Sequence, residues 1–244
     1  MRTSFCSASN RQSALAFRLT TLFLGLALSM APLTSPAKES VCYGSTLKGR
    51  LKNGVKLPEQ GDNFVSYGRL PELAGRTYVH SRVRDIVVQA YYHLSKSHPN
   101  TVFKYAETGF KNGGPFKPHK THQNGLSIDF MVPVVNAQGQ STLFPTTPFN
   151  RYGYDVEFNR KGQFQGYRID FEALGAHIVA LHQAARNQGM DLWRVLFAPE
   201  LQEFIYKTQH GNYIRKHVLI PKKKSWVRHD EHYHVDFKLP CKPL

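Results

Sequence analysis

The sequence predicts an α+β fold in which a central antiparallel sheet is flanked by helices and long loops. Two segments, at 82–97 and between 170 and 189, repeat apolar residues at the three- and four-residue spacing of amphipathic helices. Several shorter segments alternate apolar and polar residues, as strands with one buried face do. These segments do not follow a strict strand–helix–strand repeat, which favours α+β over a parallel α/β architecture.

The first part of the fold is expected to contain loops, one helix and one strand. Residues 43–80 carry several Gly and Pro and little periodicity, which indicates loops and short strands. Ser81 is expected to cap a helix over 82–97, and Pro99 ends it. The inner face of this helix consists of Val83, Ile86, Val87, Ala90, Tyr91 and Leu94. The β-forming segment 102–107 predicts the following strand.

The middle of the chain is expected to be mostly irregular. Residues 108–124 are rich in Gly and Pro and predict a loop. Residues 126–135 alternate and are rich in β-formers, so they predict one strand. A long irregular region follows over 136–169, and within it 156–165 is expected to form a hairpin that turns at 160–162.

The last part predicts a helix, a strand, a short helix and a final strand. Asp170 is expected to cap the helix, and Gly189 closes it. Its inner face consists of Phe171, Leu174, Ile178, Leu181 and Ala185. A strand is expected over 192–197, a short helix beginning with Pro199 over about 199–208, and an alternating strand over 232–237.

The N-terminal segment 1–37 has the features of a secretory signal peptide. Three arginines precede an apolar run over 19–33, and no acidic residue occurs before Glu39. The run is shorter than the roughly 20 residues of a spanning helix, so we expect cleavage near Ala37 and no stable membrane anchor. A retained anchor is the alternative. Residues 38–244 then form a single domain.

Charge and cysteine content narrow the possible functions. The 244 residues carry a net charge of +15, and 29 basic and 17 acidic residues remain after cleavage. This balance favours an acidic partner: nucleic acid, an anionic membrane or an anionic polymer.

The sequence has no Cys-x-x-Cys pair, Walker A motif or Gly-x-Gly-x-x-Gly, which argues against zinc-finger, thioredoxin and nucleotide sites. Cys6 leaves with the signal, so Cys42 and Cys241 are expected to pair in an oxidising compartment; two free thiols are the alternative.

Five of the twelve histidines lie in two short segments, PHKTHQNGLSIDF and RHDEHYHVDF. The candidate site residues are His119, His122 and Asp129 in the first segment and His229, His232 and His234 in the second. Because side chains alternate along a strand, His232, His234 and Asp236 share one face, and the residues between them face the core. Asp129 lies on the corresponding face of its own strand. Two such strands side by side would bring two imidazoles and a carboxylate together.

That set of side chains suits a divalent metal ion. Two imidazole nitrogens and one carboxylate oxygen fill three positions of a tetrahedral zinc site and leave the fourth for water, which is the open form of hydrolytic sites. An unligated histidine beside the metal can transfer a proton. We therefore expect one zinc ion per chain, with Asp236 as an outer partner paired to a basic residue or a histidine.

A family resemblance adds to this interpretation. The strings GGPFKPHKTHQNGLSIDF, WRVLFAPELQEFI and SWVRHDEHYHV, with His-x6-Asp followed about 100 residues later by His-x-His, resemble the LAS-type zinc peptidases. Within that group the chain looks most like the penicillin-insensitive murein endopeptidases. The likeness is good over about 100–238 and weaker back to Cys42.

The resemblance implies a hedgehog/D-Ala-D-Ala peptidase-like fold and hydrolysis of D-alanyl–meso-diaminopimelyl amide bonds in peptidoglycan of the periplasm. Carried over by motif, the zinc ligands are His122, Asp129 and His234, with His119 as a further metal contact, His232 as the catalytic histidine and His229 as a residue that orients the set. Lys161 and Phe164 stand where some members place ligands of additional zinc, so a second metal is not expected. The loops over 136–168 leave the cross-link preference open.

Three alternatives remain from the sequence. The first is a D,D- or L,D-carboxypeptidase of the same family, which would release terminal D-alanine. The second is a zinc-holding wall-binding module without turnover. The third, a basic nucleic-acid binder, is disfavoured by the export signal.

Overall fold

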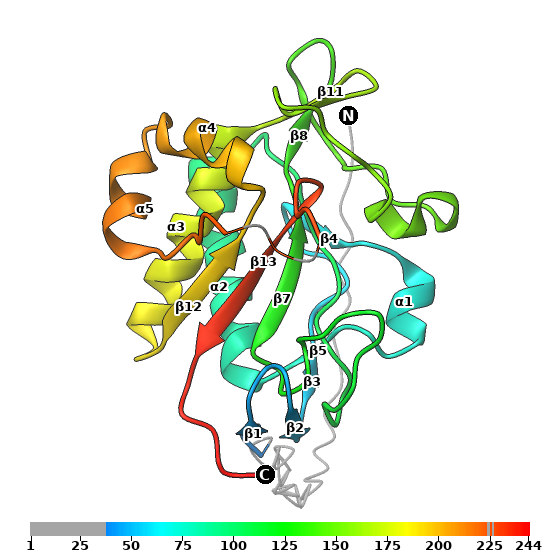
Figure 1. The fold of residues 1–244 in the computed structure, drawn as a ribbon, viewed down its shortest axis with the longest axis vertical. Helices are drawn as coiled ribbons and strands as arrows, with labels where there is room; N and C mark the ends of the chain where they lie inside the picture. Colours follow the sequence, from blue (N-terminus) through cyan, green and yellow to red (C-terminus); the bar gives the residue numbers. More distant parts are fainter. Residues whose placement is uncertain (1–37, 224, 226) are drawn as a thin grey trace, which may run out of the picture. The chain divides into compact units, whose positions relative to one another are not determined.

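The computed structural model describes residues 38–223, 225 and 227–244, which form a mixed α and β structure around one main sheet (Figure 1). The expected signal peptide over 1–37 lies outside the described residues. Within the described residues, no helix is both long and apolar enough to cross a membrane.

The main sheet has five strands in the order β12-β13-β7-β6-β4. Its members are β4 (Phe64–Ser66), β6 (Phe103–Tyr105), β7 (Ser127–Met131), β12 (Asp191–Leu196) and β13 (His232–Lys238). All neighbours are antiparallel except β4 and β6, which are parallel. The expectation of a wholly antiparallel sheet was therefore wrong at this edge, where a long connection through α2 joins the two parallel strands.

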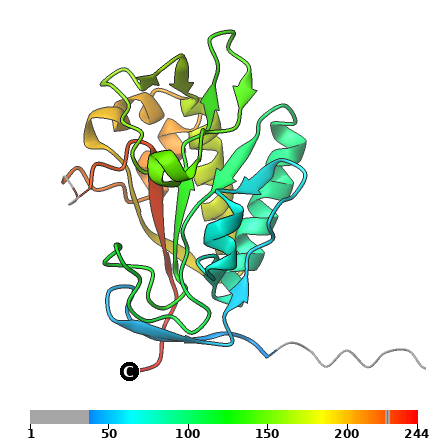
Figure 2. The same cartoon turned by 90° about the vertical axis from the view of Figure 1, so that its right-hand side faces the viewer.

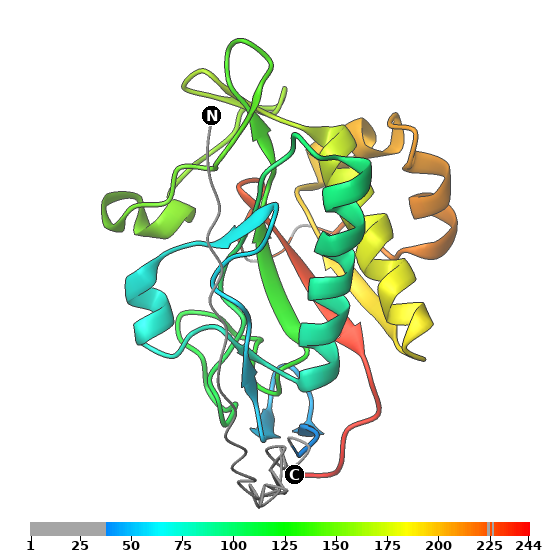
Figure 3. The same ribbon diagram turned by 180° about the vertical axis from the view of Figure 1, so that it is seen from behind.

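Two long helices cover one face of this sheet, as the view from behind shows (Figure 3). They are α2 (Ser81–Ser97) and α3 (Phe171–Asn187). Their inner residues meet the apolar sides of β7 and β13: the Phe130 and Tyr233 rings stack at 5.4 Å, and the Tyr91 ring lies edge-on to Phe130 at 6.4 Å. The opposite sides of the same two strands carry the histidines and carboxylates.

The helix caps agree with the sequence at α3 and differ at α2. The Asp170 side chain accepts a hydrogen bond from the Ala173 amide, and Gly189 closes α3 with φ +65°. At α2 the cap is His80, whose Nδ1 accepts from the Arg82 amide. The expected cap, Ser81, instead accepts from the Ser40 amide, because the N-terminal segment passes beside it.

Smaller elements complete the fold. The 126–135 segment was expected to be one strand, but it breaks after β7 because Pro133 has no amide hydrogen to donate. Its second part joins a four-stranded sheet in the order β10-β11-β8-β9. This sheet consists of β8 (Val134–Val135), β9 (Ser141–Thr142), β10 (Gln163–Phe164) and β11 (Tyr167–Ile169). The hairpin expected over 156–165 was therefore wrong in register, since the paired strands turn at Gln165–Gly166.

The remaining helices are short. The helix expected over about 199–208 is a 3-10 turn followed by α4, and within the described residues the structure adds three short helical segments that the periodicity did not reveal. The short helices are α1 (Arg69–Leu73), η1 (Pro148–Gly153), η2 (Pro199–Leu201), α4 (Gln202–Tyr206) and α5 (Gly211–His217).

The two ends of the described domain are joined. The hairpin of β1 (Val41–Gly44) and β2 (Gly49–Lys52) lies beside the C-terminus (Figure 2), and β3 (Val55–Lys56) pairs with β5 (Tyr78–Val79) nearby. Cys42 and Cys241 form the expected disulfide across 199 residues. The Lys242 amide also donates to the Cys42 carbonyl, so the last residues extend the hairpin edge.

Candidate metal centre

The register of the main sheet positions the first two site residues. His234 of β13 lies directly opposite Asp129 of β7, and its Nδ1 is 2.8 Å from Asp129 Oδ1. The other imidazole nitrogen of His234, Nε2, is 2.8 Å from Asp236 Oδ1 on the same strand. Asp236 is fully buried and also accepts from Arg194 Nε at 2.7 Å, so it pairs with a basic residue and a histidine as the sequence predicted.

His122 comes from the loop that precedes β7. Its backbone adopts a left-handed φ of +67°, and its side chain reaches Asp129. Nδ1 of this imidazole is 3.0 Å from the Thr108 carbonyl oxygen. Nε2 is fully buried, has no hydrogen-bond partner among the described residues and lies 3.3 Å from Asp129 Oδ1.

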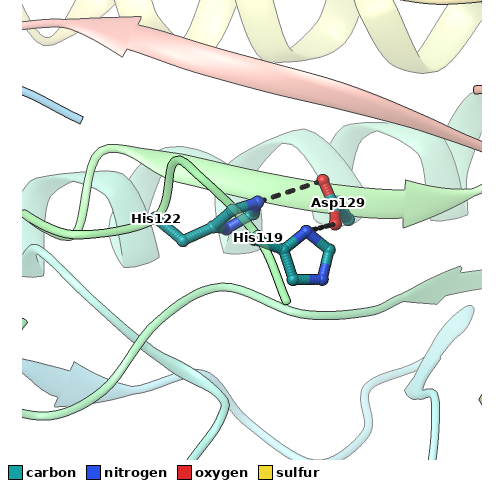
Figure 4. Close-up of side chains that lie close together, drawn as sticks. All are labelled: His119, His122 and Asp129. Atoms are coloured by element: carbon teal, nitrogen blue, oxygen red, sulfur yellow. Dashed lines mark ion pairs between the residues drawn. The ribbon is translucent and has the colours of Figure 1, made fainter. Parts of the chain in front are cut away.

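His119 also reaches the Asp129 carboxylate, on the oxygen that His122 does not face (Figure 4). Its Nδ1 is 3.6 Å from Asp129 Oδ2, and its Nε2 is 2.5 Å from Glu107 Oε2. Ligand atoms of His119, His122 and Asp129 all lie within 4.8 Å of one another.

The donor set fits a divalent metal ion. In the imidazoles of His119, His122 and His234, one nitrogen is held by a carbonyl or a carboxylate and the other is directed at Asp129. This is the outer arrangement that fixes the ring and tautomer of metal-binding histidines. A buried imidazole nitrogen without a partner, as in His122, is otherwise unfavourable. The cluster of His119, His122 and Asp129 can therefore hold a metal ion.

Burial and charge set the protonation of these groups. Desolvation lowers the pKa of His122, which favours the neutral imidazole that binds metals. Burial would raise the pKa of the Asp129 carboxyl, but the neighbouring His122 and His232 hold that pKa well below its usual range. Desolvation lowers the pKa of His234, yet Asp236 and Asp129 outweigh it and raise the pKa to about 10 in the metal-free protein, so a metal ion bound at this imidazole would displace a proton.

His232 occupies the same face of β13, two residues before His234. Its Nε2 is 3.8 Å from Asp129 Oδ2, farther than the nitrogens of the other three imidazoles. Its Nδ1 is 2.7 Å from Glu231 Oε1. Burial acts to lower the pKa of His232, but the carboxylates of Glu231 and Asp129 together outweigh it, so the pKa is raised. The pair is an imidazole oriented by a carboxylate, the arrangement of a general acid–base group.

His229 lies behind this group. Its ring centroid is 4.7 Å from that of His232, and its Nδ1 is 2.9 Å from the Val227 carbonyl oxygen. Burial lowers the pKa of His229 to about 3, and the adjacent His232 adds to the effect. The His229 ring therefore lies against the His232 ring.

Three further residues at the site were not identified from the sequence. The Tyr154 hydroxyl donates to Asp129 Oδ2 at 2.9 Å, and the Tyr154 ring lies between those of His119 and His232. Glu107 and Glu231 hold His119 and His232. Glu231 was detectable as a carboxylate next to a candidate histidine, whereas Tyr154 lies in an irregular segment without any motif.

Glu107 is itself held by a basic side chain. Arg76 donates to it through Nε at 2.5 Å and Nη2 at 2.9 Å, and the Tyr67 hydroxyl adds a third hydrogen bond at 3.1 Å. Burial would raise the pKa of Glu107, but His119 and Arg76 lower it to about 2. The carboxylate therefore stays ionised and keeps the His119 ring directed at the site.

A cavity of about 610 Å³ opens onto the site. His119, His232 and Tyr154 form part of its lining. A volume of this size accommodates a peptide-sized ligand against the cluster. The six site residues predicted from the sequence all lie at this place. Around the Asp129 carboxylate, His122 and His234 face Oδ1, and His119 and His232 face Oδ2.

Comparison with known proteins identifies the family. The family model described as penicillin-insensitive murein endopeptidase, Peptidase_M74, matches residues 42–243. A comparison with curated proteins gives no match. Since the family model covers most of the chain and includes the whole cluster, the chain belongs to the penicillin-insensitive murein endopeptidase family.

Proposed function

We propose that this protein is a zinc-dependent murein endopeptidase that hydrolyses D-alanyl–meso-diaminopimelyl amide bonds in peptidoglycan cross-links. The observation that supports it most is the arrangement of imidazoles, each with one nitrogen held and the other directed at a buried carboxylate. Membership of a murein endopeptidase family supports the substrate. The same membership and the disulfide support a periplasmic location after signal cleavage near Ala37, and a hedgehog/D-Ala-D-Ala peptidase-like fold.

His122 through Nε2, Asp129 and His234 through Nδ1 are the proposed ligands of one zinc ion per chain, with His119 as an additional contact. Zinc bound there would polarise the scissile carbonyl and lower the pKa of water. The outer groups that support this assignment are the Thr108 carbonyl and Asp236, which fix the orientation of the two imidazole ligands.

His232 is the proposed general acid–base group. Glu231 accepts from the Nδ1–H, so Nε2 carries the lone pair that takes up a proton at the cavity. His232 Nε2 accepts a proton from the attacking water and delivers it to the nitrogen of the departing diaminopimelyl group. His229 packs beside the His232 ring and keeps it in this position.

Two alternatives differ in product. A D,D- or L,D-carboxypeptidase would release free D-alanine, and a wall-binding module would release nothing. The pairing of His232 with a buried carboxylate favours turnover over binding alone, because such a pair orients a proton-transfer group. Peptidoglycan is the proposed partner, and nucleic acid is not.

The test is to incubate zinc-loaded mature protein with cross-linked murein dimers and to identify the products by chromatography and mass. Conversion of dimers into monomers supports the endopeptidase. Release of alanine from monomers with intact dimers supports the carboxypeptidase, and unchanged substrates support the binding module. The His232→Ala variant is the control, which should bind zinc but leave the dimers intact.

A further inference from the structure

The cavity beside the metal cluster carries two cations that no buried acid neutralises. Two of its four basic side chains are engaged: Arg76 is bound to Glu107, and Arg228 to several carboxylates. The other two are Lys117 and Arg151. Within the described part of the chain, the Lys117 ammonium forms no ion pair. Arg151 has a single carboxylate partner, Asp155, at 3.4 Å, and these side chains are 65% and 45% exposed.

An exposed ion pair such as Arg151–Asp155 contributes little to stability, so a ligand anion can replace Asp155 as the partner of Arg151. The acids that line the cavity are already occupied by protein partners: Glu107 by Arg76, Glu157 by Arg228 and Glu231 by His232. The charge that remains available to a ligand at the mouth of this cavity is therefore positive.

The backbone at both cations is held in place. Arg151 and its neighbour Tyr152 adopt left-handed φ values of +48° and +57°, which are unfavourable for non-glycine residues. The Asn150 side chain stabilises this turn by accepting from the amides of Thr147 and Gly153 at 2.8 and 3.0 Å. The Tyr152 ring packs edge-on against a buried tyrosine at 5.9 Å. The backbone that presents Arg151 to the cavity is thus held in place.

Lys117 is fixed from the other side. The Arg76 Nη2 donates to the Lys117 carbonyl at 2.9 Å, and the Arg76 guanidinium lies 4.0 Å from the ring of the buried Phe116. The segment that bears Lys117 also bears His119, whose ring reaches the metal cluster. Lys117 and His119 therefore line the same cavity.

We propose that Lys117 and Arg151 form a subsite for the free carboxylate next to the scissile nitrogen of the substrate. This proposal rests on the proposed function and specifies its substrate class: peptides whose amine-side residue carries an ionised carboxylate on the carbon attached to that nitrogen, as diaminopimelate does. An arginine fork and a lysine ammonium both form charge-assisted hydrogen bonds with a carboxylate. A carboxamide at the same position would lose these bonds.

The test uses two synthetic acyl-D-alanyl–diaminopimelyl peptides that differ only in this carboxylate, which is free in one and a carboxamide in the other. Binding is measured by calorimetry on the zinc-loaded His232→Ala variant, with Lys117→Gln and Arg151→Gln added singly and together. Turnover of both peptides is measured in parallel on proteins with intact His232. Lys216→Gln, which removes an exposed charge from α5, is the matched control.

We expect the carboxamide to bind about tenfold more weakly than the free acid, and the turnover of the two to differ in KM with kcat within about twofold. The double variant should bind both peptides equally, while Lys216→Gln keeps the tenfold difference. Equal binding of the two peptides by His232→Ala, or a difference that survives in the double variant, would overturn the subsite. Absence of turnover in the wild type would instead contradict the proposed function, and the binding comparison would still decide the subsite.

Discussion

Removal of the Tyr154 hydroxyl should weaken metal binding without disturbing the fold. This hydroxyl donates to Asp129 Oδ2 at 2.9 Å and accepts from the Glu107 amide at 3.4 Å. It therefore orients the carboxylate through Oδ2, while Oδ1 faces His122 and His234. In Tyr154→Phe the ring keeps its packing between two imidazoles, and the carboxylate loses its orienting donor.

The size of the effect follows from the lost hydrogen bond. A hydrogen bond to a charged group contributes about 1.5–3 kcal/mol, and outer partners of metal ligands typically affect metal affinity or activity by about 10–100-fold. We therefore expect the zinc Kd of Tyr154→Phe to rise by about 10–100-fold. The free energy of unfolding of the disulfide-bonded, metal-free protein in urea should also fall, by about 1.5–3 kcal/mol, because the buried Asp129 carboxylate loses the same hydrogen bond.

Zinc affinity is measured by competition with a chromophoric chelator, for wild type, Tyr154→Phe and Tyr92→Phe. Tyr92 is a matched control because it is 58% exposed on the outer side of α2. Tyr92→Phe should bind zinc as the wild type does. A zinc Kd of Tyr154→Phe within about twofold of the wild-type value would refute the orienting role of the hydroxyl.

Three further perturbations test the orienting carboxylate, the disulfide and a buried charge. Glu231→Gln should lower kcat by about 10–100-fold with zinc content unchanged, since His232 loses its charged partner at 2.7 Å; unchanged kcat would exclude that role. Replacing Cys42 and Cys241 by serine should lower the free energy of unfolding in urea by about 2–5 kcal/mol, because the bond closes a long loop; an unchanged midpoint would contradict this. Burial lowers the pKa of Lys104 to about 8, so between pH 8 and 10.5 the unfolded chain keeps a proton that the folded chain has lost. Over that window the wild type should gain about 3 kcal/mol of stability relative to Lys104→Met, and a pH-independent difference would count against a lowered pKa.

Local patterns predicted the elements that present the site. The three- and four-residue spacing located α2 and α3, and the alternation of His232, His234 and Asp236 with apolar residues placed these side chains on one face of β13. These features depend on neighbours within a few residues, so the sequence carries them directly. The family motif added the roles that spacing alone left open.

Features that depend on the path of the chain were not predictable in this way. Tyr154 reaches Asp129 across 25 residues, and Glu107 reaches His119 only because the loop folds back on the strand that follows it. His80, and not the expected Ser81, caps α2, because the Ser81 hydroxyl accepts a hydrogen bond from the amide of the distant Ser40. Pro133 did carry a local signal for the break after β7, which the β-forming residues on either side obscured.

The most direct test of the account is a zinc titration of chelator-treated protein with cleavage of murein dimers as the readout. The account predicts no cleavage without metal and a rise that saturates at one zinc per chain. Asp129→Ala should bind no zinc at this site and show no cleavage at any zinc concentration. Full cleavage by the metal-free wild type, or wild-type activity of Asp129→Ala, would contradict the claim that the carboxylate and its imidazoles hold the metal required for hydrolysis.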